Sequence, residues 1–188
     1  MSDKRDLIVV DTETTGLDVN FHWPLEVAAI NVQTGEELYF VPDLPDGTLD
    51  HADGKAMKIN RYFERGVFAH RLSKPDSQNS WTLLWDMLAG NTLGGSNPTF
   101  DAAMLNRAYK REFVTGEPSP WHHRLADLAA YAAPALHLPP NELEGLDKVC
   151  SYLQVKNEGD HTALGDARAT AECFKRLTEQ YTAKTVLA

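Results

Sequence analysis

The chain has 188 residues, of which 43% are hydrophobic and 24% are charged, and its formal net charge is −9. This composition excludes an intrinsically disordered chain, and the length fits one domain, which we expect to extend over residues 1–188. The acidic balance argues against a protein that coats nucleic acid through bulk positive charge, although it leaves room for a local basic groove.

The N-terminal sequence and the cysteines both favour a cytoplasmic protein. An apolar run of four residues ends at Asp11, which is too short for the core of a signal peptide or for a membrane span. Cys150 and Cys173 cannot form a disulfide framework, and neither has the spacing of a zinc ligand. We therefore expect two buried thiols, a reducing compartment and no association with a membrane.

The first part of the chain predicts a meander of three strands followed by less regular structure. Apolar or alternating runs predict strands at 6–10, 25–32 and 37–41. A stretch rich in Pro, Gly and Asp predicts a loop over 42–54, and the composition of 55–68 is helical without clear periodicity.

Helices alternate with two further strands in the rest of the chain. The predicted strands cover 92–96 and 123–128, and a turn-rich connection covers 114–121. Apolar periodicity predicts helices at 81–88, 102–113, 128–136, 141–153 and 162–182, with Asn141 as an N-cap. This order of elements indicates a single α/β or α+β domain.

Acidic residues stand at the ends of several predicted elements. Asp11 and Glu13 follow the first strand in DTETTG, and alternation along an extended chain directs both carboxylates to the same side. Asp101 follows SNPTF at the start of a helix, and His161 and Asp166 lie at the front of the last helix. Each feature alone has a structural alternative: a strand end for the first pair, a helix N-cap for Asp101, and capping or surface chemistry for the last pair.

Together, the patterns D-x-E, N-x-x-F-D and H-x4-D predict a phosphodiester hydrolase that uses two metal ions. Mg²⁺ and Mn²⁺ prefer carboxylate oxygens. Two such ions about 4 Å apart can stabilise both the attacking and the leaving oxygen of a displacement. A histidine titrates in a range suited to removing a proton from the attacking water.

With these motifs the chain resembles the DEDDh branch of the DEDD superfamily of 3′→5′ exonucleases, which contains proofreading subunits of bacterial DNA polymerases and ribonuclease T. DTETTG at 11–16, SNPTFD at 96–101 and HTALGD at 161–166 resemble the three motifs of that family. The resemblance covers nearly the whole chain. It implies an α/β, RNase H-like fold in which a mixed five-stranded sheet is flanked by helices.

The resemblance also implies a role for each motif residue. Asp11 would bridge two divalent metal ions, Mg²⁺ or Mn²⁺, and Glu13 and Asp166 would complete the ligands of the first ion. Asp101 would hold the second ion mainly through water. His161 would act as the general base.

The resemblance places the 3′-terminal nucleotide of the substrate beside the first two motifs. The residues expected to bind it are Thr14, Thr15, Gly16, Leu17, Ile59, Asn60, Asn97 and Phe100. Two departures from the family pattern concern the shape near the 3′ end: Ser96 stands where many members have a histidine, and Pro98 follows Asn97.

A set of basic residues in the middle of the chain has two interpretations. The set comprises Lys58, Arg61, Arg65, Arg71 and Lys74. These residues could form a solvated helix face, or they could contact phosphates of an incoming strand.

The sequence therefore predicts a 3′→5′ exonuclease that releases nucleoside monophosphates from 3′ ends of mainly single-stranded DNA. Two alternatives stay open, namely an exoribonuclease that trims RNA 3′ ends and a non-catalytic subunit associated with a polymerase. The expected partners are single-stranded DNA or RNA 3′ ends and, as a candidate, a DNA polymerase. The oligomeric state is left open between monomer and homodimer.

Overall fold

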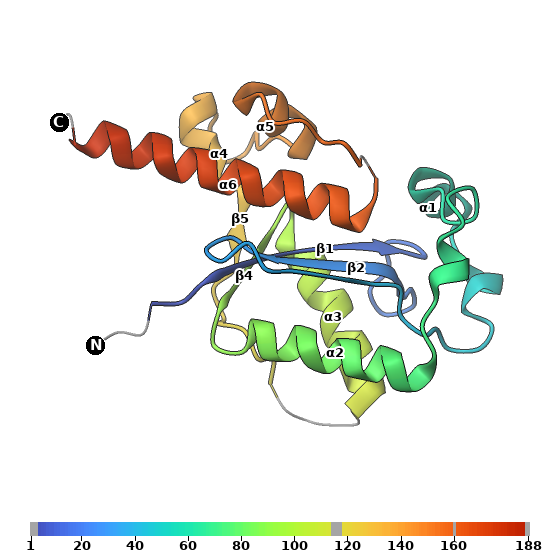
Figure 1. The fold of residues 1–188 in the computed structure, drawn as a ribbon. Helices are drawn as coiled ribbons and strands as arrows, with labels where there is room; N and C mark the ends of the chain where they lie inside the picture. Colours follow the sequence, from blue (N-terminus) through green and yellow to red (C-terminus); the bar gives the residue numbers. More distant parts are fainter. Residues whose placement is uncertain (1–3, 114–117, 160, 187–188) are drawn as a thin grey trace.

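The computed structural model describes residues 4–113, 118–159 and 161–186, and it contains a five-stranded mixed sheet with helices on both faces (Figure 1). The strands are β1 (Leu7–Thr14), β2 (Pro24–Asn31), β3 (Glu37–Phe40), β4 (Thr92–Gly95) and β5 (Ala126–Asp127). Their order is β3-β2-β1-β4-β5. The first three pair antiparallel, whereas β4 is parallel to β1 and β5 is parallel to β4. The predicted meander and the mixed five-stranded sheet flanked by helices are confirmed.

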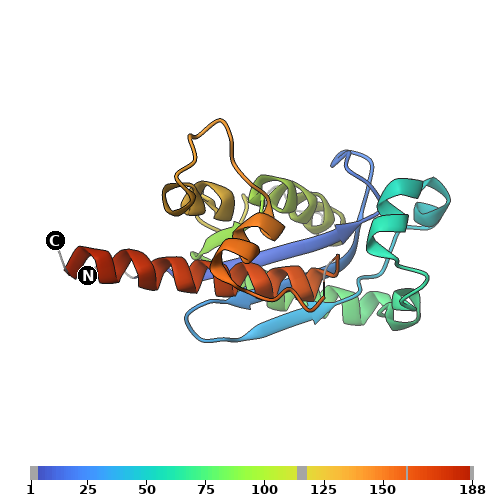
Figure 2. The same ribbon diagram turned by 90° about the horizontal axis from the view of Figure 1, so that it is seen from above.

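The helices form two layers, with one further helix at an end of the sheet. Helices α4, α5 and α6 cover one face, and α2 and α3 cover the other (Figures 1 and 2). Helix α1 stands beyond the end of β1. The bounds are α1 (Gly54–Asn60), α2 (Lys74–Leu88), α3 (Pro98–Phe113), α4 (Leu128–Leu136), α5 (Leu146–Leu153) and α6 (Ala163–Val186), with short 3-10 turns at Thr48–His51 and Val67–His70.

The alternation of side chains along β1 decides which layer each residue meets. Val9 packs into the core beneath α6, together with Ala28 and Ile30 of β2. Ile8 and Val10 point the other way, into the core beneath α2 and α3. Because alternate residues share a face, the positions that continue the row of Val9 toward the end of β1 face α6.

Two of the predicted boundaries are wrong near the site. Strand β1 continues past Asp11 because β2 keeps pairing with it as far as Thr14, and Glu13 lies opposite Glu26. Helix α2 begins seven residues earlier than predicted, at Lys74. The Ser73 hydroxyl accepts a hydrogen bond from the Asp76 amide there, and a proline in the first turn suits the helix start.

The second half of the chain differs from the prediction in two places. Helix α5 begins at Leu146 after Gly145, so the predicted N-cap at Asn141 is wrong. Strand β5 has only two residues, because its pairing with β4 is limited to Gly94 and Gly95. Residues 114–117 of the predicted turn-rich connection lie outside the described residues.

The cysteines agree with a further expectation from the sequence. Cys150 and Cys173 are buried free thiols in the core beneath α6, with their sulfur atoms 3.6 Å apart. Within the described ranges, none of the helices combines the length and the apolar character that crossing a bilayer requires.

Candidate active site

Three carboxylates meet where β1 ends beneath the start of α6. Asp11 and Glu13 come from β1, and Asp166 comes from the first turn of α6. One oxygen from each of the three side chains lies within 4.8 Å of the others, and all three side chains are half-buried. The structure thus brings together three of the four acids that the sequence proposes as metal ligands.

Local structure explains this meeting. Asp11 and Glu13 continue the row of Val9, so both face α6. Small residues on the buried side of α6, Ala163 and Ala167, let this helix pack closely on the sheet. The amide nitrogen of Asn157 donates a hydrogen bond of 2.5 Å to the Asp166 carboxylate and orients it.

Asp101 reaches the same region from the opposite layer. It is the fourth residue of α3, so the alternative of an N-cap is wrong. The residue is only 4% exposed, and its carboxylate accepts a hydrogen bond of 2.7 Å from the hydroxyl of Thr12, the β1 residue between Asp11 and Glu13. Asp101 lies outside the compact group of three, but its charge contributes to raising the pKa of Asp11.

The electrostatics of the site favour a bound cation. Burial raises the pKa of Asp11 well above its ordinary value, and the charges of Asp101, Asp166 and Glu13 raise it further. Burial, followed by Asp166, raises the pKa of Glu13 to about 7. Burial also raises the pKa of Asp101 to about 7. Crowded, partly dehydrated carboxylates repel one another, and a divalent cation with oxygen ligands would relieve that repulsion.

His161 lies on the loop that leads into α6. It is exposed, has a left-handed backbone (φ 57°), and lines a cavity of about 380 Å³ together with Asp147, Lys148 and Asp166. Its positive charge would lower the pKa of Glu13, which places the imidazole within electrostatic reach of the acidic cluster.

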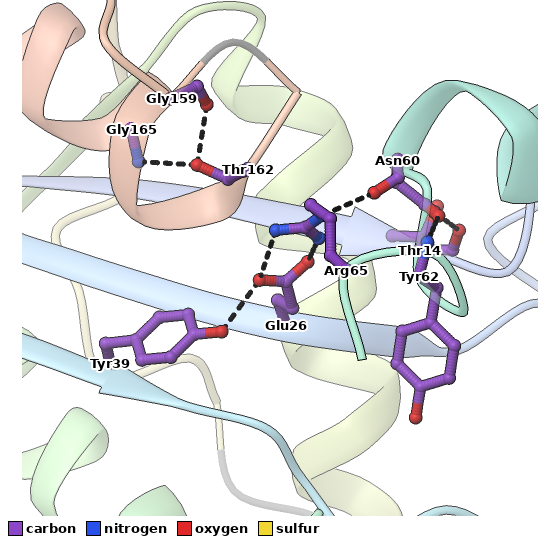
Figure 3. Close-up of polar contacts among 9 residues, drawn as sticks. All are labelled: Thr14, Glu26, Tyr39, Asn60, Tyr62, Arg65, Gly159, Thr162 and Gly165. Carbon is purple, nitrogen blue, oxygen red and sulfur yellow. Dashed lines mark hydrogen bonds and ion pairs between the residues drawn. The ribbon is translucent and has the colours of Figure 1, made fainter. Parts of the chain in front are cut away.

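A tight turn fixes the shape of the His161 loop. The Thr162 hydroxyl donates to the Gly159 carbonyl oxygen at 2.6 Å and accepts from the Gly165 amide at 3.1 Å (Figure 3). A Cβ atom on Gly165 would lie 2.3 Å from the Gly159 oxygen, so only glycine fits at that position.

Most of the residues expected to bind substrate gather at the end of β1. The Asn60 side chain donates to the Thr14 carbonyl oxygen at 3.1 Å (Figure 3). The Thr15 hydroxyl contacts His22 at 3.1 Å, and the His22 ring leaves no room for a side chain on Gly16. Two apolar side chains of this predicted set project into solvent, Leu17 at 81% and Ile59 at 42% exposure.

The remaining two lie at the end of the neighbouring strand. Asn97 is exposed with a left-handed backbone (φ 63°), and Phe100 is half-buried in the first turn of α3. Both follow β4, which runs parallel to β1, so they lie at the same end of the sheet as the C-terminal end of β1. In the described residues, neither is hydrogen-bonded to the group around Thr14 and Asn60.

The basic residues do not form one uniform surface. Lys58, Arg61, Arg71 and Lys74 are exposed. Arg65 is different, because its guanidinium is ion-paired with the buried carboxylate of Glu26. For Arg65, the interpretation as a solvated face is wrong.

Sequence reasoning missed several residues that support the site. Glu26, Thr12 and Asn157 contact Arg65, Asp101 and Asp166 respectively. The available signal for Glu26 was an acid inside the otherwise apolar run LEVAAINV. Thr12 and Asn157 carry no comparable signal, because a hydroxyl or an amide is unremarkable at a strand end or in a loop.

Comparison with known proteins agrees with this geometry. The family model "Exonuclease" (RNase_T) matches residues 8–174. The chain belongs to this exonuclease family. Residues 8–174 include the acidic cluster, the His161 loop and α1.

The chain is similar to segments of much longer proteins. It is 23% identical over 184 residues to the PolC-type DNA polymerase III of Halalkalibacterium halodurans, covering 97% of the chain and 12% of the polymerase. It is 24% identical over 180 residues to the corresponding polymerase of Lacticaseibacillus paracasei, covering 93% and 11%. The chain thus spans about an eighth of the length of these relatives.

Solved structures share the RNase H-like exonuclease fold. Exonuclease I of E. coli in complex with a dT13 oligonucleotide superposes with a TM-score of 0.73 at 18% identity, covering 97% of this chain and 43% of that one. Exonuclease I of Methylocaldum szegediense gives 0.70 at 18% identity, covering 94% and 41%.

Proposed function

We propose that the chain is a 3′→5′ exonuclease that depends on divalent metal ions and releases nucleoside monophosphates from 3′ ends of mainly single-stranded DNA. The observation that carries this proposal is the cluster of Asp11, Glu13 and Asp166, with Asp101 beside it, in a chain of the exonuclease family. The described residues then act as a single exonuclease domain.

The acids divide into two overlapping ligand sets for Mg²⁺ or Mn²⁺. Asp11, Glu13 and Asp166 would hold one ion, and Asp11 and Asp101 the other. When bound, these cations stabilise the negative charge that develops on the phosphate and make water a better nucleophile. The raised pKa values of Asp11, Glu13 and Asp101 support this assignment, because cations would hold these groups ionised at neutral pH.

His161 would take the proton from the attacking water. Its exposed position beside Asp166 and within reach of Glu13 supports this role, because the imidazole can exchange the proton with solvent after each turnover. The turn of Gly159, Thr162 and Gly165 would hold the imidazole near the scissile phosphate.

The terminal nucleotide would bind at the end of β1. Thr14, Thr15 and Gly16 would line the pocket with their backbone, and the exposed Leu17 and Ile59 offer apolar surfaces for the base or sugar. Asn60, Asn97 and Phe100 would complete the pocket.

Single-stranded DNA is the substrate that the comparisons favour. The E. coli exonuclease I structure contains an oligodeoxynucleotide, and the curated relatives are DNA polymerases. These relatives also support a DNA polymerase as a candidate partner, whereas RNA 3′ ends stay an alternative that the experiment must separate.

Degradation of 5′-labelled single-stranded DNA and RNA of equal sequence tests the proposal. The reactions contain Mg²⁺, Mn²⁺ or EDTA, with Asp11→Ala as the control for contaminating nucleases. We expect a metal-dependent ladder that shortens from the 3′ end of DNA and is missing in the variant. A ladder on RNA alone would favour the exoribonuclease, and no ladder on either would favour the non-catalytic subunit.

A further inference from the structure

A fifth carboxylate is buried beside the acidic cluster. Glu26 of β2 lies directly opposite Glu13 of β1, so the two side chains share the sheet face that α6 covers. Glu26 is only 1% exposed. Burying an ionised carboxylate is costly unless charged and hydrogen-bonding partners surround it, so its partners indicate why it is there.

Two side chains satisfy Glu26. Arg65 contacts both of its oxygens, with Nη1 at 3.3 Å from Oε2 and with Nη2 on Oε1. The Tyr39 hydroxyl donates to Oε2 at 2.7 Å (Figure 3). The two-pronged contact uses the planar fork of the guanidinium, which a lysine cannot reproduce.

Arg65 also holds the end of α1. Its Nε donates to the Asn60 carbonyl oxygen at 2.8 Å, and the Asn60 side chain donates to the carbonyl oxygen of Thr14, the residue after Glu13. Glu26, Arg65, Asn60 and Thr14 thus form one continuous hydrogen-bonded chain from β2 through α1 to the end of β1 (Figure 3).

Packing in a small core also fixes the segment that follows α1. Tyr62 is fully buried in a small core with Leu25 and Val67, and its amide donates to the Asn60 side chain at 3.1 Å. The Asn60 side-chain amide therefore both donates and accepts a hydrogen bond, and Arg65 connects the Asn60 backbone to Glu26 on the sheet face of the acidic cluster.

We propose that Arg65 is a positioning residue that uses buried Glu26 as a fixed anchor on the sheet and holds α1 over the end of β1, so that Ile59 and Asn60 are preorganised for the 3′-terminal nucleotide. This inference rests on the proposed exonuclease function. It assigns to Arg65 a role different from a phosphate contact, because three of its N–H groups are directed at Glu26 and Asn60. Preorganisation removes an ordering cost from binding, so its loss appears in KM.

The test compares Arg65→Gln and Arg65→Lys with the wild type on two substrates. The first is a labelled oligodeoxynucleotide, and the second is the p-nitrophenyl ester of thymidine 5′-monophosphate, which carries one nucleotide and no upstream phosphate. We expect KM to rise about 10-fold on both substrates, which corresponds to about 1.4 kcal/mol, with kcat changed less than about 3-fold. We also expect an unchanged salt dependence on the oligonucleotide.

Arg65→Lys keeps a positive charge beside Glu26 but lacks the Nε donor to Asn60. If Arg65→Gln does not fold, the comparison of Arg65→Lys with the wild type is sufficient for the test. The matched control is Arg176→Gln, because Arg176 likewise joins a carboxylate, Glu172, to the backbone oxygens of Leu153 and Gln154 at the end of a helix. It should change stability without changing either KM.

Coupling to Asn60 gives a second readout. Asn60→Ala keeps the carbonyl oxygen that Arg65 contacts but removes the side-chain link to Thr14. If Arg65 acts through that link, the rise in KM of the double variant Arg65→Gln/Asn60→Ala should be smaller than the product of the rises in the two single variants. Additive effects would overturn the inference. A higher KM on the oligonucleotide only, with a weaker salt dependence, would overturn it in favour of a phosphate contact. Unchanged kinetics of both Arg65 variants in an active enzyme would also overturn it, whereas an inactive wild type would instead refute the proposed function.

Discussion

Replacing Asp101 by asparagine should stabilise the metal-free protein at alkaline pH. The substitution keeps an oxygen that can accept the Thr12 hydrogen bond but removes a buried charge. The pKa of Asp101 is raised to about 7 from 3.8. A shift of that size corresponds to about 4 kcal/mol between the two protonation states.

The raised pKa of Asp101 determines how the stability of the folded protein changes with pH. The folded protein holds the proton more tightly than the unfolded chain, so this group's contribution to stability is fully present below about pH 4 and is lost as pH rises through about 7. Burying the uncharged amide costs about 1–2 kcal/mol. We therefore expect Asp101→Asn to gain about 2 kcal/mol at pH 8, a rise in Tm of about 4–8 °C, and to lose this advantage at pH 5.

Thermal unfolding in EDTA at both pH values measures this difference. In Mg²⁺ the wild type should recover stability that the variant does not. Asp86→Asn, which changes an exposed carboxylate of α2, is the control and should shift stability by less than about 0.5 kcal/mol. A Tm difference that is independent of pH, or a variant less stable than the wild type at pH 8, would show that the buried charge of Asp101 does not destabilise the metal-free fold.

Two further predictions concern the loop before α6 and the start of that helix. Gly165→Ala should reduce exonuclease kcat at least about 10-fold, because its Cβ would lie 2.3 Å from the Gly159 oxygen and displace the His161 loop. The control is Gly54→Ala, which should retain activity because a Cβ there meets nothing within 4 Å. Equal activity of the two variants would contradict the steric argument. Asn157→Ala removes the hydrogen bond to Asp166 and should raise the Mg²⁺ concentration for half-maximal activity about 10-fold, as measured by metal titration. An unchanged titration would show that Asp166 binds metal without the hydrogen bond from Asn157.

Much of the fold could be predicted because local hydrophobic patterns in the sequence indicate the strands of the sheet. The runs at 25–32 and 37–41 alternate or stay apolar over the lengths of β2 and β3, and helix α4 has the predicted bounds, Leu128–Leu136. Boundaries set by tertiary pairing could not be predicted. Strand β1 extends to Thr14 only because β2 lies beside it, and that pairing carries Glu13 into the sheet.

The acidic residues of the candidate site could be predicted from the sequence, whereas the residues that contact and position them mostly could not. Asp11, Glu13 and Asp166 stand out because carboxylates at the ends of apolar elements have no simple packing role, and the structure gathers them within 4.8 Å. Arg65 resembled any surface arginine, since its partner Glu26 is 39 residues away in the chain and becomes its neighbour only when the segment after α1 folds against the sheet. Contacts of that range leave no periodic signal in a sequence.

Release of the terminal nucleotide shows directly whether the acidic cluster hydrolyses DNA from its 3′ end. A single-stranded DNA labelled at its 3′-terminal nucleotide is mixed with excess protein in Mg²⁺ or EDTA, beside Asp11→Ala and Asp166→Asn. We expect labelled nucleoside monophosphate to be the first product, to form only with metal, and to be absent with both variants. Labelled fragments of several nucleotides, or monophosphate that persists in EDTA or in either variant, would contradict this expectation.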